Sequence, residues 1–124
     1  MVFKHNGWAL GGEYFDRRCD DPLTFNPDSA VRAVTVGTGL NVQLSKVLHS
    51  NYEFAARYTL VDPAKDIAAY RHRTEEILLG SSKYLNGHRI KLQLYAGYRW
   101  TDALMAFDHS GNTWTALFQV EFGI

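Results

Sequence analysis

The feature that most constrains the fold is the stretch 81–100, SSKYLNGHRIKLQLYAGYRW, in which apolar and polar side chains alternate after an Asn-Gly pair. Asn-Gly is the pair most typical of a two-residue type I′ turn, because both turn residues need a positive φ. The sequence therefore predicts a β-hairpin that turns at Asn86-Gly87. A two-residue turn also fixes the register, so that Tyr84 should lie opposite Arg89 and Ser82 opposite Lys91.

The second strand of this hairpin separates its side chains by face. Every second residue from 90 to 100 is apolar or aromatic. The strand segment that carries this face spans about the 9 to 11 residues that a tilted strand needs to cross a bilayer. The opposite face is too polar for a packed core and consists of Arg89, Lys91, Gln93, Tyr95, Gly97 and Arg99. An apolar face toward lipid and a polar face toward water are typical of a membrane β-barrel.

Alternation recurs along the chain and predicts seven strands in all. They lie at 1–5, 8–17, 31–44, 52–60 and 112–122, with two more in 81–100. A second pair, Asn6-Gly7, predicts a tight turn with Phe3 opposite Leu10 and Lys4 opposite Ala9. Long loops are expected at 18–30, 61–73 and 101–111. Only 66–79 could form a short helix, although its apolar residues do not recur at three and four.

The predicted connections alternate between short (6–7, 45–51, 86–87) and long. Outer-membrane barrels have short periplasmic turns on one rim and long extracellular loops on the other. The predicted fold is therefore all-β: an antiparallel up-and-down transmembrane β-barrel segment of about seven strands, which is an incomplete barrel. This topology puts Met1 at the extracellular rim, whereas complete bacterial barrels have an even number of strands. We therefore expect residues 1–124 to be the C-terminal hairpins of a larger barrel, a single partial domain.

Composition excludes several classes of function. The 13 basic and 13 acidic residues give zero net charge, which does not support a nucleic-acid partner. The one cysteine, Cys19, cannot form an internal disulfide and provides no metal cluster. No apolar run approaches the roughly 18 residues of a membrane helix, so a membrane role would rely on strands. We expect no cofactor, no metal site and no enzyme activity, because no nucleophile and base can be placed together.

The polar faces of the predicted strands supply the candidate channel-lining residues. Six are basic and four acidic, which predicts a mild preference for anions. The alternative is that these charges only neutralise one another across the lumen and hydrate it. The set is Lys4, Arg17, Arg57, Arg89, Lys91, Arg99, Glu13, Glu53, Glu76 and Glu121.

Aromatic residues near the ends of the apolar faces are predicted to lie at the membrane interfaces, where Trp and Tyr are enriched. They are Trp8, Tyr14, Tyr52, Tyr58, Tyr98, Trp100 and Trp114.

Five segments, in order, resemble the C-terminal region of the phosphate-selective porin family, the O and P porins: VFKHNGWALGGEYFDRR, GTGLNVQL, YEFAARYTLVDP, KYLNGHRIKLQL and WTALFQVEF. The resemblance covers nearly the whole chain, and YLNGHRIKLQ is its most specific part. It implies a homotrimeric porin of about sixteen strands in a Gram-negative-type outer membrane. Such a porin passes small anions passively, and some members prefer phosphate. The hairpin 84–93 and Arg57 carry over as wall residues, not as anion-binding residues.

The resemblance also implies the partners: outer-membrane lipid, the remaining strands of the same barrel, further copies in a homotrimer, and small anions as solutes. A second hypothesis is a small soluble antiparallel barrel that binds an apolar ligand, in the manner of lipocalins or avidin. That protein would turn the apolar face inward and Arg89, Lys91 and Arg99 outward. Alternation alone does not decide between the two orientations.

Overall fold

The computed structural model describes residues 1–25, 31–85, 90–101 and 111–122. Its main element is one antiparallel sheet of seven strands in the order β1-β2-β5-β6-β7-β8-β9, which confirms the predicted all-β, up-and-down, unclosed sheet. The strands are β1 (Val2–His5), β2 (Trp8–Arg17), β5 (Gly37–Val47), β6 (Tyr52–Pro63), β7 (Thr74–Leu85), β8 (Ile90–Thr101) and β9 (Thr113–Phe122).

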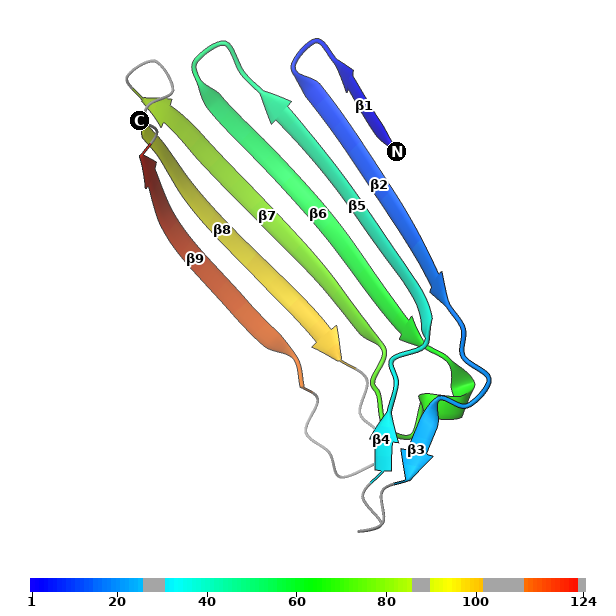
Figure 1. The fold of residues 1–124 in the computed structure, drawn as a ribbon. Helices are drawn as coiled ribbons and strands as arrows, with labels where there is room; N and C mark the ends of the chain where they lie inside the picture. Colours follow the sequence, from blue (N-terminus) through cyan, green and yellow to red (C-terminus); the bar gives the residue numbers. More distant parts are fainter. Residues whose placement is uncertain (26–30, 86–89, 102–110, 123–124) are drawn as a thin grey trace.

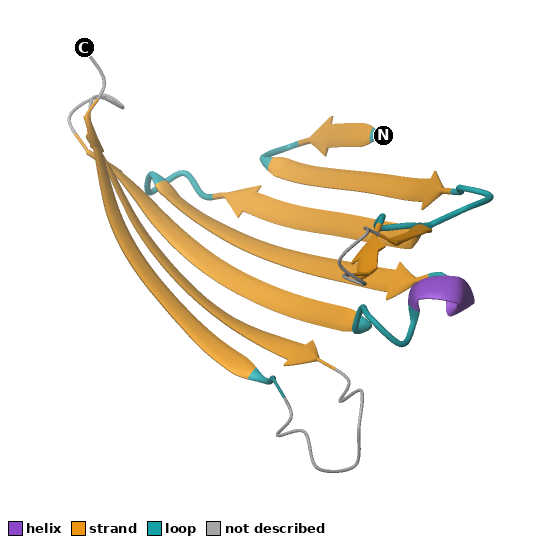
Figure 2. Cartoon of the chain, turned by 60° about the horizontal axis from the view of Figure 1, so that its bottom comes forward, coloured by secondary structure: helices purple, strands orange, loops and turns teal. Residues whose placement is uncertain are grey.

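Short and long connections separate to opposite ends of the sheet, as predicted (Figure 1). The short-turn rim holds the connections 6–7 and 48–51, and β7 ends and β8 begins at the same rim. The long-loop rim holds residues 18–25, residues 31–36 and the connection 64–73, and β8 ends and β9 begins there. Two strands, β3 (Leu23–Phe25) and β4 (Val31–Ala33), pair with each other at this rim, beside the 3₁₀ helix η1 (Lys65–Ile67) (Figure 2).

The first turn has the backbone conformation and the register that the Asn-Gly pair predicts. Asn6 and Gly7 have φ values of 45° and 76°, and Phe3 faces Leu10 while Lys4 faces Ala9. The position of Met1, however, differs from the prediction. Its carbonyl accepts a hydrogen bond from the Gly12 amide at 2.9 Å, so Met1 lies beside the middle of β2 and not at the long-loop rim.

The register of the β7–β8 hairpin also differs from the prediction. The closing pair is Leu85 with Ile90, and Tyr84 faces Lys91, where a two-residue turn would have placed Arg89. The connection is therefore 86–89; these residues, which include Asn86-Gly87 and Arg89, lie outside the described part of the chain. The shift is two residues, and side chains repeat with a period of two, so every predicted face is unchanged.

Strand β7 begins at Thr74, whereas the predicted hairpin began at residue 81. Local alternation fails in β7, because Glu75 lies on the mainly apolar face and Leu78 on the mainly polar one. Pairing with β6 on one side and β8 on the other nevertheless extends the strand. Strand β6 likewise continues to Pro63, which takes the last position of its ladder.

Strand β5 begins at Gly37 and not at residue 31, and part of the predicted loop 18–30 forms β3. Gly37 has φ 134°, and a Cβ there would collide with the carbonyl oxygen of Asp62, so only glycine fits this strand entry. Val36, which lies inside the predicted strand 31–44, is instead buried at 3% exposure before the strand starts.

Very little of the described chain is buried. Outside residues 24–33, Val36 and Ile67 are the only buried hydrophobic residues of the described chain. Both lie at the long-loop rim, where the Ala64 amide donates to the Val36 carbonyl at 3.0 Å. The curved sheet shown in Figure 2 therefore has no hydrophobic core over either face among the described residues.

Candidate functional site

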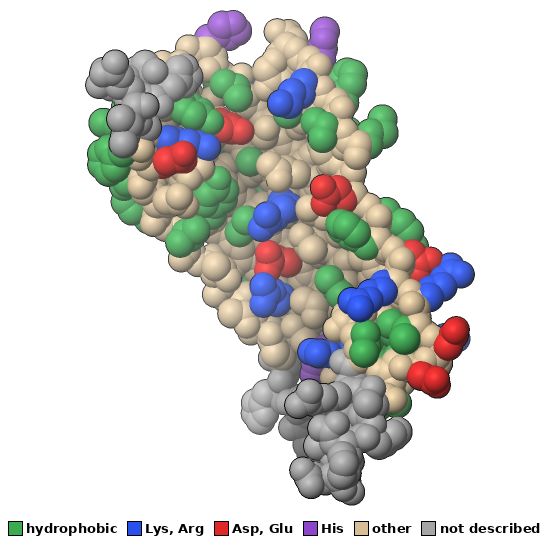
Figure 3. Space-filling model, in the orientation of Figure 1, with side chains coloured by type: hydrophobic (Ala, Val, Ile, Leu, Met, Phe, Trp, Pro, Cys, Tyr) green, Lys and Arg blue, Asp and Glu red, His purple; other side chains and the backbone are tan. Residues whose placement is uncertain are grey.

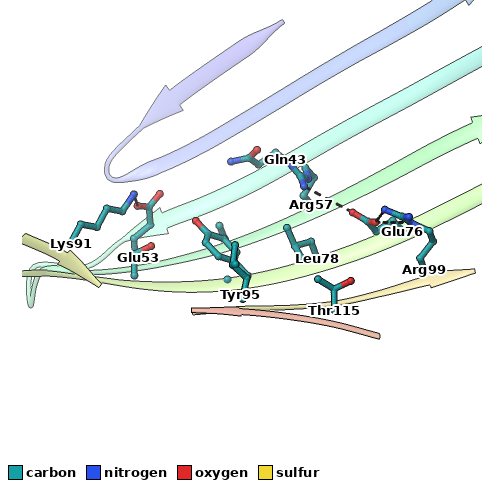
Figure 4. Close-up of a pocket in the computed structure, with 13 residues that line it drawn as sticks. Gln43, Glu53, Arg57, Glu76, Leu78, Lys91, Tyr95, Arg99 and Thr115 are labelled. Carbon is teal, nitrogen blue, oxygen red and sulfur yellow. Dashed lines mark hydrogen bonds and ion pairs between the residues drawn. The ribbon is translucent and has the colours of Figure 1, made fainter. Parts of the chain in front are cut away.

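The polar side chains of β5 to β9 line a groove of about 520 Å³ on one face of the sheet. We call this the polar face, and the opposite one the apolar face. Figure 3 shows basic and acidic side chains along the middle of the face turned to the viewer, and Figure 4 shows the groove residues pointing to the same side. Of the predicted channel-lining set, the groove brings together Glu53, Arg57, Glu76, Lys91 and Arg99.

Glu76 lies between two arginines. Arg99, its cross-strand partner on β8, donates from Nε and Nη2 to the same carboxylate oxygen at 2.9 and 2.7 Å. From β6, Arg57 Nη2 lies 4.0 Å from the other oxygen. The Arg57 Nε is buried and has no hydrogen-bond partner in the described chain. One carboxylate thus faces two guanidinium groups, which leaves a local charge of about +1.

A second charged cluster lies nearer the short-turn rim. The Tyr84 hydroxyl donates to a Glu53 carboxylate oxygen at 2.6 Å, and Lys91 Nζ lies 4.0 Å from that oxygen. Lys91 also lies 5.1 Å from the centre of the Tyr84 ring. The ring and the carboxylate together hold the ammonium group against the wall of the groove.

Tyr95 is a groove residue that the candidate site set did not include. Its ring lies over Gly80, its cross-strand partner, so closely that a Cβ on Gly80 would collide with the ring carbons. Gln93 Nε2 donates to the Tyr95 hydroxyl at 3.0 Å. The bare backbone of Gly80 thus lets a large aromatic ring lie along the sheet. The sequence does place a glycine and an aromatic residue on the polar face. Their contact, however, could be predicted only with the correct register of the two strands.

Of the other predicted lining residues, Arg89 lies outside the described residues, and the remaining four lie on the polar face without joining these clusters. Lys4 and Glu13 border a smaller hollow with Asn41 and Gln43, Arg17 ends β2, and Glu121 faces Lys91 across the β8–β9 pair. Within the described chain, none of Lys4, Arg17, Glu13 and Glu121 has an ion pair within 4.0 Å.

The apolar face carries all seven predicted interface aromatics. Trp8 and Tyr52 lie toward the short-turn rim; the other five lie on the long-loop side. On that side Tyr98 lies 4.6 Å from Trp114 and 4.8 Å from Trp100 between ring centres. Between the two groups runs an aliphatic row across six strands: Leu10, Leu44, Ala56, Leu79, Ala96 and Ala116.

Charges on the apolar face are confined to its rims. At the long-loop rim, Glu75 accepts from the Tyr58 hydroxyl at 2.8 Å and from Arg73 at 2.9 Å. Just beyond β2, Arg18 donates to Asp16 at 2.6 Å, and this hydrogen bond raises the pKa of Arg18. The acidic residue Glu75 was not in the predicted set, because it interrupts an apolar alternation.

Comparisons with protein-family models, with curated proteins and with solved structures gave no match. The described residues include no helix that is long and apolar enough to cross a membrane. In the same residues, no three His, Cys, Asp or Glu side chains gather where they could hold a metal ion. The geometry of the two faces is therefore the basis for a functional assignment.

Proposed function

We propose that this chain forms part of the wall of an outer-membrane porin, through which small anions, phosphate among them, diffuse passively. The observation that carries this proposal is the opposite chemistry of the two faces of one sheet. One face has an aliphatic row flanked by aromatics, and the other has a groove lined by charged and polar groups. This division matches the lipid-facing and water-facing sides of a transmembrane barrel.

Exposure of the apolar face supports a lipid partner. Leu79, Leu94 and Phe118 are 57%, 58% and 65% exposed, and no second layer covers them in the described chain. A soluble sheet buries its apolar face against another element, because exposed apolar surface in water is unfavourable. Lipid tails would cover this face without any further protein layer.

The position of the groove favours a porin over a soluble ligand-binding barrel. A lipocalin-like protein would need its apolar face on the hollow side, to enclose an apolar ligand. Here a groove of about 520 Å³ lies on the polar face, between Glu53, Arg57, Lys91 and Arg99. Such a surface suits water and small ions.

The charge of the groove supports a preference for anions. Arg57, Lys91 and Arg99 face two carboxylates, Glu53 and Glu76, so that the groove has one excess positive charge. Low-dielectric walls strengthen the field of such a charge, which raises the local concentration of anions. Passage would need further strands to close the wall, because β1 and β9 are both open edges. The proposal includes a homotrimer, because the porin family that the sequence resembles is homotrimeric.

The experiment that tests the orientation makes the same substitution at two leucines of similar exposure. Leu79, in the aliphatic row, is 57% exposed, and Leu117, on the polar face, is 50% exposed. Leu79→Arg should destabilise the lipid-inserted protein by about 2 to 4 kcal/mol, because the arginine must enter the hydrocarbon. Leu117→Arg should have little effect, because its side chain would enter water. Urea unfolding of vesicle-inserted protein measures both, and equal tolerance would refute the proposal.

A further inference from the structure

Two lysines on the apolar face share one unusual arrangement at the short-turn rim. Lys46 Nζ donates to the Asn6 carbonyl at 2.8 Å and lies 4.9 Å from the centre of the Trp8 ring. Lys83 Nζ donates to the Ser50 carbonyl at 3.0 Å and lies 3.7 Å from the centre of the Tyr52 ring. Each ammonium group is held by a turn carbonyl and an aromatic face.

The described surroundings of these lysines on the apolar face carry no compensating charge. Within the described chain, the apolar-face residues in the same two cross-strand rows include no carboxylate: His5, Trp8, Phe54, Ser81, Leu94 and Phe118 in one, and Tyr52, Leu92 and Val120 in the other. The carboxylates of this face, Asp16, Asp62 and Glu75, lie at the opposite rim. The apolar face is therefore positive at one rim only.

We propose that Lys46 and Lys83, with Trp8 and Tyr52, form a binding site for the phosphate headgroups of anionic phospholipids. An ammonium group has three N–H donors, and each lysine uses one on a carbonyl, so donors remain for a phosphate oxygen. The aromatic rings sit at headgroup depth, while the aliphatic row beyond them would contact the acyl chains. This inference rests on the proposed function, because it needs the apolar face to lie in a bilayer.

The test compares partitioning of the 124-residue chain into vesicles of phosphatidylcholine and of phosphatidylcholine mixed with phosphatidylglycerol. A lysine near an anionic surface contributes about a fivefold gain in affinity, so two contribute about thirtyfold. The double variant Lys46→Gln, Lys83→Gln should lose about that factor of preference for phosphatidylglycerol. Lys46→Arg with Lys83→Arg should keep the preference, because the charge remains.

The matched control removes two positive charges from the other rim. Lys65 and Arg71 are exposed on the 64–73 connection, and Lys65→Gln with Arg71→Gln should leave the preference nearly unchanged. An equal loss in both double variants would reveal a general charge effect and overturn the inference. A second measurement replaces the chloride of the buffer by inorganic phosphate at the same ionic strength. If the preference for phosphatidylglycerol is then lost, free phosphate is the ligand, and this result too would overturn the inference.

Binding to pure phosphatidylcholine vesicles separates the two proposals. If the unmodified chain does not bind them, its apolar face has no affinity for lipid, so the proposed function fails and this inference fails with it. If it binds but the Lys46→Gln, Lys83→Gln variant retains the full phosphatidylglycerol preference, only this inference fails.

Discussion

Arg99 donates two hydrogen bonds to a single oxygen of Glu76, its cross-strand neighbour, while Arg57 faces the other oxygen from 4.0 Å. The carboxylate thereby partly neutralises two cations that would otherwise face the groove alone. Because Glu76 is itself largely shielded at 21% side-chain exposure, its charge acts mainly on these arginines. In the proposed porin, the Glu76 charge would therefore limit the preference of this wall for anions.

Replacing Glu76 should therefore strengthen anion preference. In a barrel that contains this segment, Glu76→Gln raises the net charge of the groove from one to two positive charges. The zero-current potential in a salt gradient should move toward anion selectivity. Glu75→Gln is the matched control, because the neighbouring side chain lies on the apolar face. Equal shifts in both variants would contradict the assignment of the faces.

The faces could be predicted from the sequence because a strand alternates with a fixed period of two. The Tyr84 pairing was wrong by two residues, and yet Lys91 and Arg99 still came to the polar face. The extent of β7 could not be predicted, because Glu75 and Leu78 break the local alternation. Their positions depend on pairing with β6 and β8, which is information from distant parts of the chain.

Contacts between side chains on different strands could not be predicted without the register of the folded sheet. Tyr95 and Gly80 belong to different strands, and the expected two-residue turn would have paired Gly80 with Gln93. The same limitation hid the shared carboxylate of Arg57 and Arg99. The residues that line the groove could thus be predicted one by one from the sequence, whereas the residues that they contact could not.

The packing of Tyr95 on Gly80 predicts a specific loss of stability. A Cβ at position 80 would overlap the ring, so Gly80→Ala should cost about 1 to 3 kcal/mol, as overpacking commonly does. Gly12→Ala is the control, because no atom lies within 4 Å of its Cβ position. In a double-mutant cycle, Tyr95→Leu should remove most of the penalty. Unfolding in urea measures the four proteins of the cycle and the Gly12→Ala control, and an equal cost at both glycines would contradict the packing.

The 124-residue chain alone should form no stable conducting pore. Its seven-stranded sheet leaves β1 and β9 with open edges, and unpaired backbone groups in lipid cost several kcal/mol each. The chain should instead associate through its edges. Planar-bilayer recording of the purified monomer provides the check, and steady unitary currents would contradict the open sheet.

Reversing the charge of Lys91 should move selectivity the other way. Lys91 lies in the groove 4.0 Å from Glu53, so Lys91→Glu adds a second, unpaired carboxylate beside the first. In a complete barrel the zero-current potential should shift toward cations, and Lys91→Gln should produce about half that shift because it removes one charge where Lys91→Glu removes two. The shift should be larger in dilute salt, since the Debye length falls to about 10 Å at 0.1 M. An unchanged potential in a folded Lys91→Glu barrel would mean that ions do not pass along this face.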